Sequence, residues 1–349
     1  MSPAAASPST DPDRLLALID RFAGRTIAVV GDLMADEFIY GRVERVSREA
    51  PVLILQYDTA ITTPGGAGNA ANNVAALGAR VRLAGVAGRD EPGRRLIASL
   101  LGRVAREGIV RPPDFATPLK TRILAGGVHS AKQQVVRIDR VAGAPPGAAV
   151  RRRFERAARD AARRADAVLV SDYGSGLVTP ALVARLRRGA GGRAGRPVLV
   201  DSRYAATAFT GVTACTPNES EVEQLLGVRI NDDAAALERA GRSLLRRTRN
   251  EALLITRGSL GMALFEPGRP TRHIAIAGSD EIADVTGAGD TVIATMTLAV
   301  AAGGTFLDAA RLANYAGGIV VMKRGTATVS PGELKDAVRA GTHRSGRGR

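Results

Sequence analysis

The chain has little cysteine and histidine, and this shortage excludes several kinds of site. It holds one cysteine, Cys215, and three histidines among 349 residues. One cysteine cannot form an intrachain disulfide, and these numbers exclude a Cys/His zinc cage and disfavour a Cys–His nucleophile pair. We therefore expect a reducing, cytoplasmic location. We interpret Cys215 as a small packed side chain at the end of a strand.

Lysine and aromatic residues are also scarce, although the formal net charge is +15. The chain has four lysines against 45 arginines, aromatic residues make up 3% of it, and tryptophan is absent. So few aromatics provide no platform on which bases could stack, so we expect no nucleic-acid partner. A positive field of this kind suits the attraction of anionic, phosphorylated substrates.

Three familiar kinds of segment are missing. No apolar run reaches the roughly 18–20 residues of a membrane span, and residues 1–10 lack the basic and apolar regions of a signal peptide. We therefore expect no membrane association. None of the lysines follows a glycine, which excludes a Walker A loop. A dinucleotide fingerprint can be forced onto residues 66–71, but Thr62-Thr63-Pro64 precedes it in place of a tight βα turn.

Short apolar, often β-branched runs alternate with helical patterns along most of the chain. Strand runs cover residues 26–30, 81–86, 167–170, 197–200, 212–215 and 252–255, and helical patterns cover residues 11–22, 72–77, 91–106, 152–164, 180–188 and 234–247. Continuous apolar strands separated by helices predict a mostly parallel sheet covered by helices on both faces. The fold class is therefore α/β.

Two segments, residues 36–63 and 118–139, interrupt this rhythm. They carry strand-like runs with no helix between them, at residues 51–57, 120–124 and 134–138. We expect antiparallel pairing in both segments, which would form a small β-sheet lid on one large α/β domain over residues 11–340. Residues 1–10 and the basic tail at 341–349 are expected to be unstructured.

The strongest chemical signal is the run Asp284-Val-Thr-Gly-Ala-Gly-Asp-Thr291, which an apolar helix follows. Its small residues let the backbone N–H groups of Gly287, Ala288 and Gly289 converge on one point, beside the positive end of a helix dipole. Asp290 lies in this anion-binding turn, where it could take a proton from an attacking hydroxyl. The alternative is an ordinary glycine-rich helix start with Asp290 as its N-cap.

This run resembles the second signature of the PfkB/ribokinase family of sugar kinases. The first signature resembles residues 64–73, an Asn-x-x-Glu element resembles residues 218–221, and the likeness runs in order from about Thr26 to Val338. Within that family, the chain is most similar to the D-glycero-β-D-manno-heptose-7-phosphate kinases, in residues 31–36, 46–52, 133–139, 171–174 and 323–326. The resemblance implies a ribokinase-like fold, with ATP, Mg²⁺ and optionally a monovalent cation as cofactors.

The resemblance carries roles over to single positions. It implies that Asp290 is the catalytic base and that Gly287, Ala288 and Gly289 form an anion hole for the transferred phosphoryl group. Asn218 and Glu221 match the family's Mg²⁺ and phosphate element, although a helix N-cap with a capping box would have the same spacing. The positions on the nucleotide side are Asn218, Thr256, Gly258, Gly261, Asp284, Thr286, Asn314 and Gly317.

The substrate side is implied in the same way, at Asp36, Gly65, Gly66, Asn69, Lys120, Arg137 and Asp172. A carboxylate, an amide and bare backbone offer a polyol both donors and acceptors. Asp36 could instead be an exposed strand residue. Lys120, Arg122 and Arg137 lie on the expected lid and could meet a substrate phosphate or be solvated basic residues.

Two segments depart from the heptose-kinase pattern. Those kinases usually carry lysine where this chain has Ser175, and Asp-Pro-Lys where it has Asp201-Ser202-Arg203. The expected function is still phosphorylation of the heptose 7-phosphate at O1. Ribose, fructose or a fructose phosphate are alternative substrates, and a non-catalytic sugar- or nucleotide-binding protein is the alternative class.

The resemblance also bears on assembly. Some relatives carry a fused nucleotidyltransferase domain, and nothing of that kind follows Val338, so only the kinase half-reaction is expected. Edge strands in the lid, together with the resemblance, suggest a homodimer formed through the lid.

Overall fold

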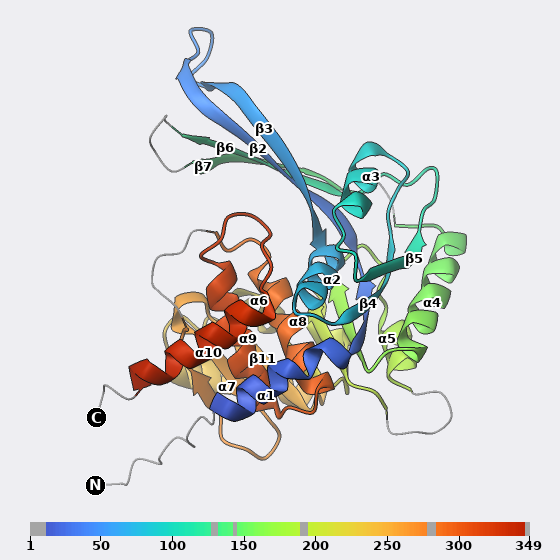
Figure 1. Cartoon of the computed structure of the whole chain (residues 1–349), viewed down its shortest axis with the longest axis vertical. Helices are drawn as coiled ribbons and strands as arrows, with labels where there is room; N and C mark the ends of the chain where they lie inside the picture. Colours follow the sequence, from blue (N-terminus) through green and yellow to red (C-terminus); the bar gives the residue numbers. More distant parts are fainter. Residues whose placement is uncertain (1–11, 127–131, 142–144, 189–194, 278–283, 346–349) are drawn as a thin grey trace.

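A large twisted sheet forms the centre of the molecule (Figure 1). The computed structural model describes residues 12–126, 132–141, 145–188, 195–277 and 284–345. The strand order is β13-β12-β11-β10-β9-β8-β1-β4-β5. The strands are β1 (Thr26–Gly31), β4 (Arg80–Val86), β5 (Val104–Val110), β8 (Ala167–Asp172), β9 (Val198–Ser202), β10 (Ala214–Cys215), β11 (Ala252–Thr256), β12 (Met262–Phe265) and β13 (Arg272–Ile274). Seven are parallel, and β12 and β13 are antiparallel to their neighbours.

Helices cover both faces of this sheet, as the alternation of buried residues along β1 requires. Ile27 and Val29 belong to the core under one set of helices, while Ala28 and Val30 belong to the core under the other. The first set is α1 (Pro12–Asp20), α2 (Ala67–Ala76), α3 (Glu91–Ala98), α8 (Ala288–Ala301), α9 (Phe306–Val320) and α10 (Pro331–Ser345). The second is α4 (Ala148–Arg163), α5 (Pro180–Arg187), α6 (Glu219–Leu226) and α7 (Ala234–Thr248). The predicted α/β class is confirmed.

A separate four-stranded sheet extends away from this body (Figure 1). It consists of β2 (Leu33–Val46), β3 (Leu53–Gly66), β6 (Leu119–Gly126) and β7 (Gln133–Arg140), in the order β3-β2-β6-β7. The antiparallel pairing predicted within each segment is confirmed, by β2 with β3 and by β6 with β7. The two segments join through β2 and β6, which are parallel, and this pairing was not predicted. The chain returns through α2, β4, α3 and β5 between β3 and β6, and such a long crossover allows parallel pairing where a hairpin does not.

The prediction of a helix over residues 91–106 was wrong for the C-terminal half of that segment. Helix α3 ends at Ala98, and Val104 begins the edge strand β5, which pairs with β4. Sheet pairing overrides the helical spacing of apolar residues there. The predicted tail at 341–349 starts inside α10, which continues to Ser345, whereas residues 346–349 and the predicted N-terminal segment 1–10 lie outside the described residues.

Cys215 ends strand β10 and is buried, as predicted. Its thiol accepts a hydrogen bond from the Asn250 side-chain amide, and burial raises the pKa of the thiol to about 12. In the residues that the structure describes, no helix has the length and apolar character needed to cross a membrane.

Candidate active site

Helix α8 begins at the glycine-rich run, and its first residues have little room for side chains. Gly287 is the N-cap with φ of 79° and makes no side-chain capping bond. A β-carbon on Gly287 would lie 2.4 Å from Nδ2 of Asn69, so glycine is required both by this close approach and by the left-handed backbone. Asp290 lies in the first turn of α8. The alternative interpretation of Asp290 as the N-cap is therefore wrong.

Asp290 is 3% exposed and is held by two neutral donors. Asn69 Nδ2 donates to Asp290 Oδ2 at 2.8 Å, and the Tyr173 hydroxyl donates to Asp290 Oδ1 at 3.3 Å. Burial raises the pKa of Asp290 to about 7; the charge of Asp36 adds to the increase, and Asn69, Tyr173 and Lys120 oppose it. A carboxylate that titrates near neutral pH suits general-base chemistry.

A buried chain of hydrogen bonds fixes the orientation of the Asn69 amide. Thr291 Oγ1 donates to Asn73 Oδ1 at 2.8 Å, and Asn73 Nδ2 donates to Asn69 Oδ1 at 3.1 Å and to the Asn69 carbonyl at 3.0 Å. Because Asn69 Oδ1 accepts from Asn73, its Nδ2 is the atom that faces Asp290. Asn73 and Thr291 therefore orient the Asn69 amide so that its N–H group donates to Asp290.

The second sheet supplies another buried aspartate to the same region. Arg122 Nη1 donates to Asp36 Oδ1 at 2.6 Å, and the two side chains are 11% and 7% exposed. A β-carbon on Gly65 would overlap the Asp36 carboxylate, at 2.2 Å from Oδ2. Asp36 is thus a packed, ion-paired residue, and the alternative of an exposed strand position is wrong. Gly66, with φ of 55°, is the N-cap of α2.

Basic side chains gather on the same side of the site. The Lys120 ammonium lies 5.0 Å from the centre of the Tyr173 ring. Burial lowers the pKa of Lys120, and repulsion from Arg203 and Arg137 lowers it further, against the attraction of Asp36. Arg137 is exposed and pairs with Asp139 at 2.6 Å. These cations are therefore close enough to influence one another electrostatically.

The turn after β8 is built around two aspartates. Asp172 accepts hydrogen bonds from the Gly174 amide at 3.0 Å and the Ser202 hydroxyl at 2.7 Å. Asp32 accepts from the Tyr173 amide at 2.7 Å and from the Ser175 hydroxyl. Ser175, one of the two departures from the heptose-kinase pattern, therefore supports the turn that carries Tyr173. Both oxygens of Asp172 have protein partners, so its substrate role stays a prediction.

Asn218 and Glu221 form the capping box that the sequence allowed. Asn218 Oδ1 accepts from the Glu221 amide at 2.8 Å, and Glu221 Oε2 accepts from the Asn218 amide at 2.9 Å. Burial raises the pKa of Glu221. At the end of β9, the pKa of Asp201 is raised well above its usual range by burial, then by the charges of Asp290 and Glu221. Carboxylates from three elements therefore repel one another beside the start of α8.

The predicted nucleotide positions lie on the strands and helices next to this cluster. Thr256 pairs with Asn218 in a β-bridge, and Gly317 packs on Val292 of α8, where a β-carbon would lie 3.4 Å from Cγ2. Asn314 donates to the Ala275 carbonyl at 2.8 Å. Gly258 begins a short 3₁₀ turn between β11 and β12 and Gly261 follows it, both with positive φ.

Asp284 and Thr286 belong to the loop that precedes α8. Asp284 accepts hydrogen bonds from the amide of Thr286 at 2.9 Å and from the amide of Gly325 at 3.0 Å. These bonds tie the loop to the segment between α9 and α10.

Sequence reasoning missed Tyr173, Asp201, Asn73 and Thr291 as members of the site. Asp201 and Tyr173 lie at or just after the carboxyl ends of β9 and β8, where ligands gather in parallel sheets, so their place in the pattern was a usable signal. Asn73 and Thr291 end the two signature segments, residues 64–73 and 284–291, but no local pattern predicts their contact, because they are 218 positions apart.

Comparison with known proteins identifies the family and the fold of this chain. The model of the "pfkB family carbohydrate kinase" matches residues 25–332. The chain is 44% identical over 308 residues to the bifunctional protein HldE of Geobacter metallireducens, covering 88% of this chain and 61% of that protein. It is 42% identical to HldE of Caulobacter vibrioides, covering 92% of this chain and 65% of that protein. The chain thus spans less than two thirds of the length of these relatives.

Solved structures share the fold at low sequence identity. Arabidopsis thaliana ribokinase complexed with ribose and ATP superposes with a TM-score of 0.71 at 19% identity, over 90% of this chain and 99% of that one. Phosphofructokinase-2 from Escherichia coli, in complex with potassium, gives 0.71 at 16% identity, over 90% and 98%. The chain belongs to the pfkB family of carbohydrate kinases, phosphotransferases that act on an alcohol group.

Proposed function

We propose that this chain transfers the γ-phosphoryl group of ATP to a hydroxyl of a sugar phosphate, with Asp290 as the general base. Asp290 would accept the proton of the attacking hydroxyl, because burial brings its pKa to about 7 while Asn69 and Tyr173 orient both of its oxygens. The Ala288 N–H group donates to the Val285 carbonyl at 3.2 Å, which takes Ala288 out of the predicted anion hole and leaves the N–H groups of Gly287 and Gly289 at the start of α8. They would stabilise charge on the transferred group without moving.

The observation that carries the choice of a sugar phosphate is the basic group beside Asp36. Burial lowers the pKa of Lys120, and repulsion from the charges of Arg203 and Arg137 lowers it further, against the attraction of Asp36 and Asp139. A neutral sugar would leave this repulsion in place, whereas a phosphate dianion would relieve it. Asp36, Asn69, Gly65 and Gly66 would hold hydroxyls. Among sugar phosphates we propose D-glycero-β-D-manno-heptose 7-phosphate, phosphorylated at O1, from the matching motifs and the similarity to HldE.

We assign the nucleotide and its metal ion to the other side of Asp290. Within the described residues, no three His, Cys, Asp or Glu side chains are grouped as a metal cage. Mg²⁺ usually takes one or two carboxylates and fills its remaining positions with water and substrate phosphates. Burial raises the pKa of both Glu221 and Asp201, and the charges of Asp290 and Glu221 raise that of Asp201 further. A cation beside these carboxylates and Asn218 would favour their charged forms, and it would neutralise charge on the phosphates.

The exposed apolar side chains of the second sheet support a homodimer formed through that sheet. They are Val43, Val46, Leu53, Tyr57, Ile61, Val135, Val136 and Ile138. An apolar patch on a sheet with two free edges is a common protein–protein contact. We propose a cytoplasmic dimer, consistent with the single buried thiol. Sedimentation as a monomer at micromolar concentration would rule the dimer out.

The test is ADP release from Mg-ATP with the heptose 7-phosphate, ribose, fructose, fructose 6-phosphate and no sugar. We expect turnover with the heptose phosphate that Asp290→Asn abolishes, and wild-type turnover in Asp336→Asn, an exposed aspartate of α10. Turnover only with ribose or fructose would overturn the sugar-phosphate proposal but keep the kinase. Binding of sugar and ATP without turnover on any acceptor would favour the non-catalytic alternative.

A further inference from the structure

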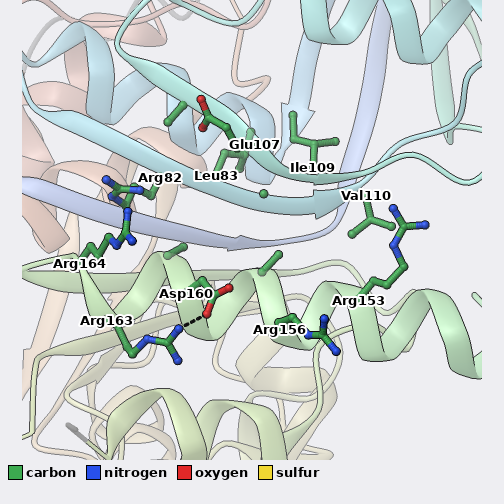
Figure 2. A pocket seen from close by; sticks show the side chains of 14 residues that line it. Arg82, Leu83, Glu107, Ile109, Val110, Arg153, Arg156, Asp160, Arg163 and Arg164 are labelled. Atoms are coloured by element: carbon green, nitrogen blue, oxygen red, sulfur yellow. Dashed lines mark hydrogen bonds and ion pairs between the residues drawn. The ribbon is translucent and has the colours of Figure 1, made fainter.

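A strongly basic hollow lies on the side of the main sheet where β4 and β5 pack on α4 (Figure 2). Its volume is about 490 Å³, within the range of small-molecule sites. Five arginines line it, namely Arg82, Arg153, Arg156, Arg163 and Arg164, against the two carboxylates Glu107 and Asp160. None of these residues belongs to the site around Asp290.

Arg82 and Arg164 come from different elements and meet at one end of this hollow. Arg82 is a half-buried residue of β4, and Arg164 follows α4. Figure 2 shows their guanidinium groups close together, and both side chains also line a second hollow that shares lining residues with the first. Three further arginines, Arg80, Arg103 and Arg106, line the second hollow. Arg103 and Arg106 already donate to the carbonyls of Gly78 and Leu100.

The charges in this space are poorly balanced. Asp160 is already paired with Arg163, and in the portion of the chain covered by the structure no hydrogen bond or ion pair reaches the side chains of Arg82, Arg153, Arg156 or Arg164. Arg82 is half-buried, whereas Arg153, Arg156, Arg163 and Arg164 are exposed, so water weakens their mutual repulsion. An anion between these like charges would replace the remaining repulsion with attraction. Guanidinium groups bind phosphate oxygens through paired N–H donors.

The rest of the lining limits the kind of anion. Leu83, Ile109, Val110 and Ala161 provide an apolar floor, on which the organic part of a phosphorylated metabolite would pack while its phosphates meet the arginines. The hollow also has no aromatic residue among its lining, so it offers nothing on which a base could stack. We propose that this arginine hollow binds a small phosphorylated metabolite through a diphosphate or two phosphate groups, at a site separate from the catalytic one.

The test is calorimetric titration of the full chain with inorganic pyrophosphate at physiological ionic strength. The matched variants are Arg82→Gln/Arg164→Gln and Arg152→Gln/Arg159→Gln, which remove the same charge; the second pair lies on α4 outside the hollow. The active site is unchanged in both variants. Weaker pyrophosphate binding in Arg82→Gln/Arg164→Gln alone would therefore show that the ion binds in the hollow. We expect one binding event per chain to weaken at least tenfold there, and to stay within twofold of wild type in the control.

Equal binding in all three proteins would overturn the proposal, as would equal weakening in both variants, which would indicate a diffuse effect of net charge. Absence of any pyrophosphate binding to the hollow would also overturn it. Tight, steeply salt-dependent binding of duplex DNA, lost in Arg82→Gln/Arg164→Gln while pyrophosphate fails to bind, would assign the hollow to nucleic acid instead. Melting temperatures of the variants control for folding.

Discussion

Two buried aspartates in one site are treated in opposite ways by the two regions that supply them. The second sheet gives Asp36 an arginine, with Arg122 at 2.6 Å. The main domain gives Asp290 only neutral donors, Asn69 and Tyr173, and Lys120 acts on it from farther away. A paired carboxylate can hold a hydroxyl group in place, whereas an unpaired one with a pKa of about 7 can exchange a proton. The contrast separates binding from catalysis.

The largest effect should follow removal of the unpaired carboxylate. Asp290→Asn keeps the shape of the side chain and removes the base, so kcat should fall by about a thousandfold, with KM changed little, since general bases typically contribute 10²–10⁴-fold. Steady-state kinetics with the accepted sugar measures this. A variant that keeps more than a tenth of wild-type kcat would contradict the assignment of Asp290.

Loss of the ion pair at Asp36 should lower the free energy of unfolding. Arg122→Met leaves Asp36 buried without its partner, which should cost about 3–5 kcal/mol in the free energy of unfolding. The second change Asp36→Asn should restore most of that loss. Arg137→Gln breaks the more exposed pair with Asp139 and should cost under about 1 kcal/mol. Urea unfolding compares the three variants, and equal losses at Arg122 and Arg137 would remove the proposed contrast.

A smaller effect is expected when Asp290 loses one neutral donor. The Tyr173 hydroxyl lowers the pKa of Asp290, so Tyr173→Phe should raise it. The acidic limb of kcat/KM should then move to higher pH, with activity several-fold low at pH 7 and close to wild type at pH 9. If Tyr173→Phe is still less active than wild type at pH 9, Tyr173 acts through substrate binding instead.

The smallest effect is expected from the support behind Asn69. Thr291→Val removes the hydroxyl that donates to Asn73 Oδ1 while keeping the shape of the side chain. The Asn69 amide should lose part of its fixed orientation, with kcat falling less than tenfold and the acidic limb moving upward. Thr295→Val, which removes a hydroxyl bonded to the helix backbone, is the matched control. The same pH shift in both would indicate a general effect on α8.

The sequence predicted the parts of this molecule that depend on short stretches of chain. The strands around β1 and β8 follow from continuous apolar runs, and the start of α8 follows from Gly287 and its neighbours. Strand β5 could not be read in the same way, because its residues fit a helical spacing and become a strand only by pairing with β4. The parallel pairing of β2 with β6 likewise depends on a crossover of more than fifty residues.

The candidate site shows the same limit. Asp290 and Asn69 were predicted from motifs, but their contact joins residues 221 positions apart, and no local pattern specifies it. Nor could the sequence tell that Arg122 pairs with Asp36 while Arg137 pairs with Asp139, because both arginines lie on neighbouring strands of one sheet.

The most direct test is the pH dependence of the unfolding free energy of Asp290→Asn relative to wild type. A carboxyl group with a pKa near 3.9 when unfolded and about 7 when folded destabilises the folded state increasingly as pH rises between those values, and constantly above them. The variant should therefore gain stability relative to wild type from pH 4 to 7, on the order of 4 kcal/mol, and then reach a plateau. A difference that stays flat, or that falls as pH rises, would contradict an unpaired catalytic carboxylate at Asp290.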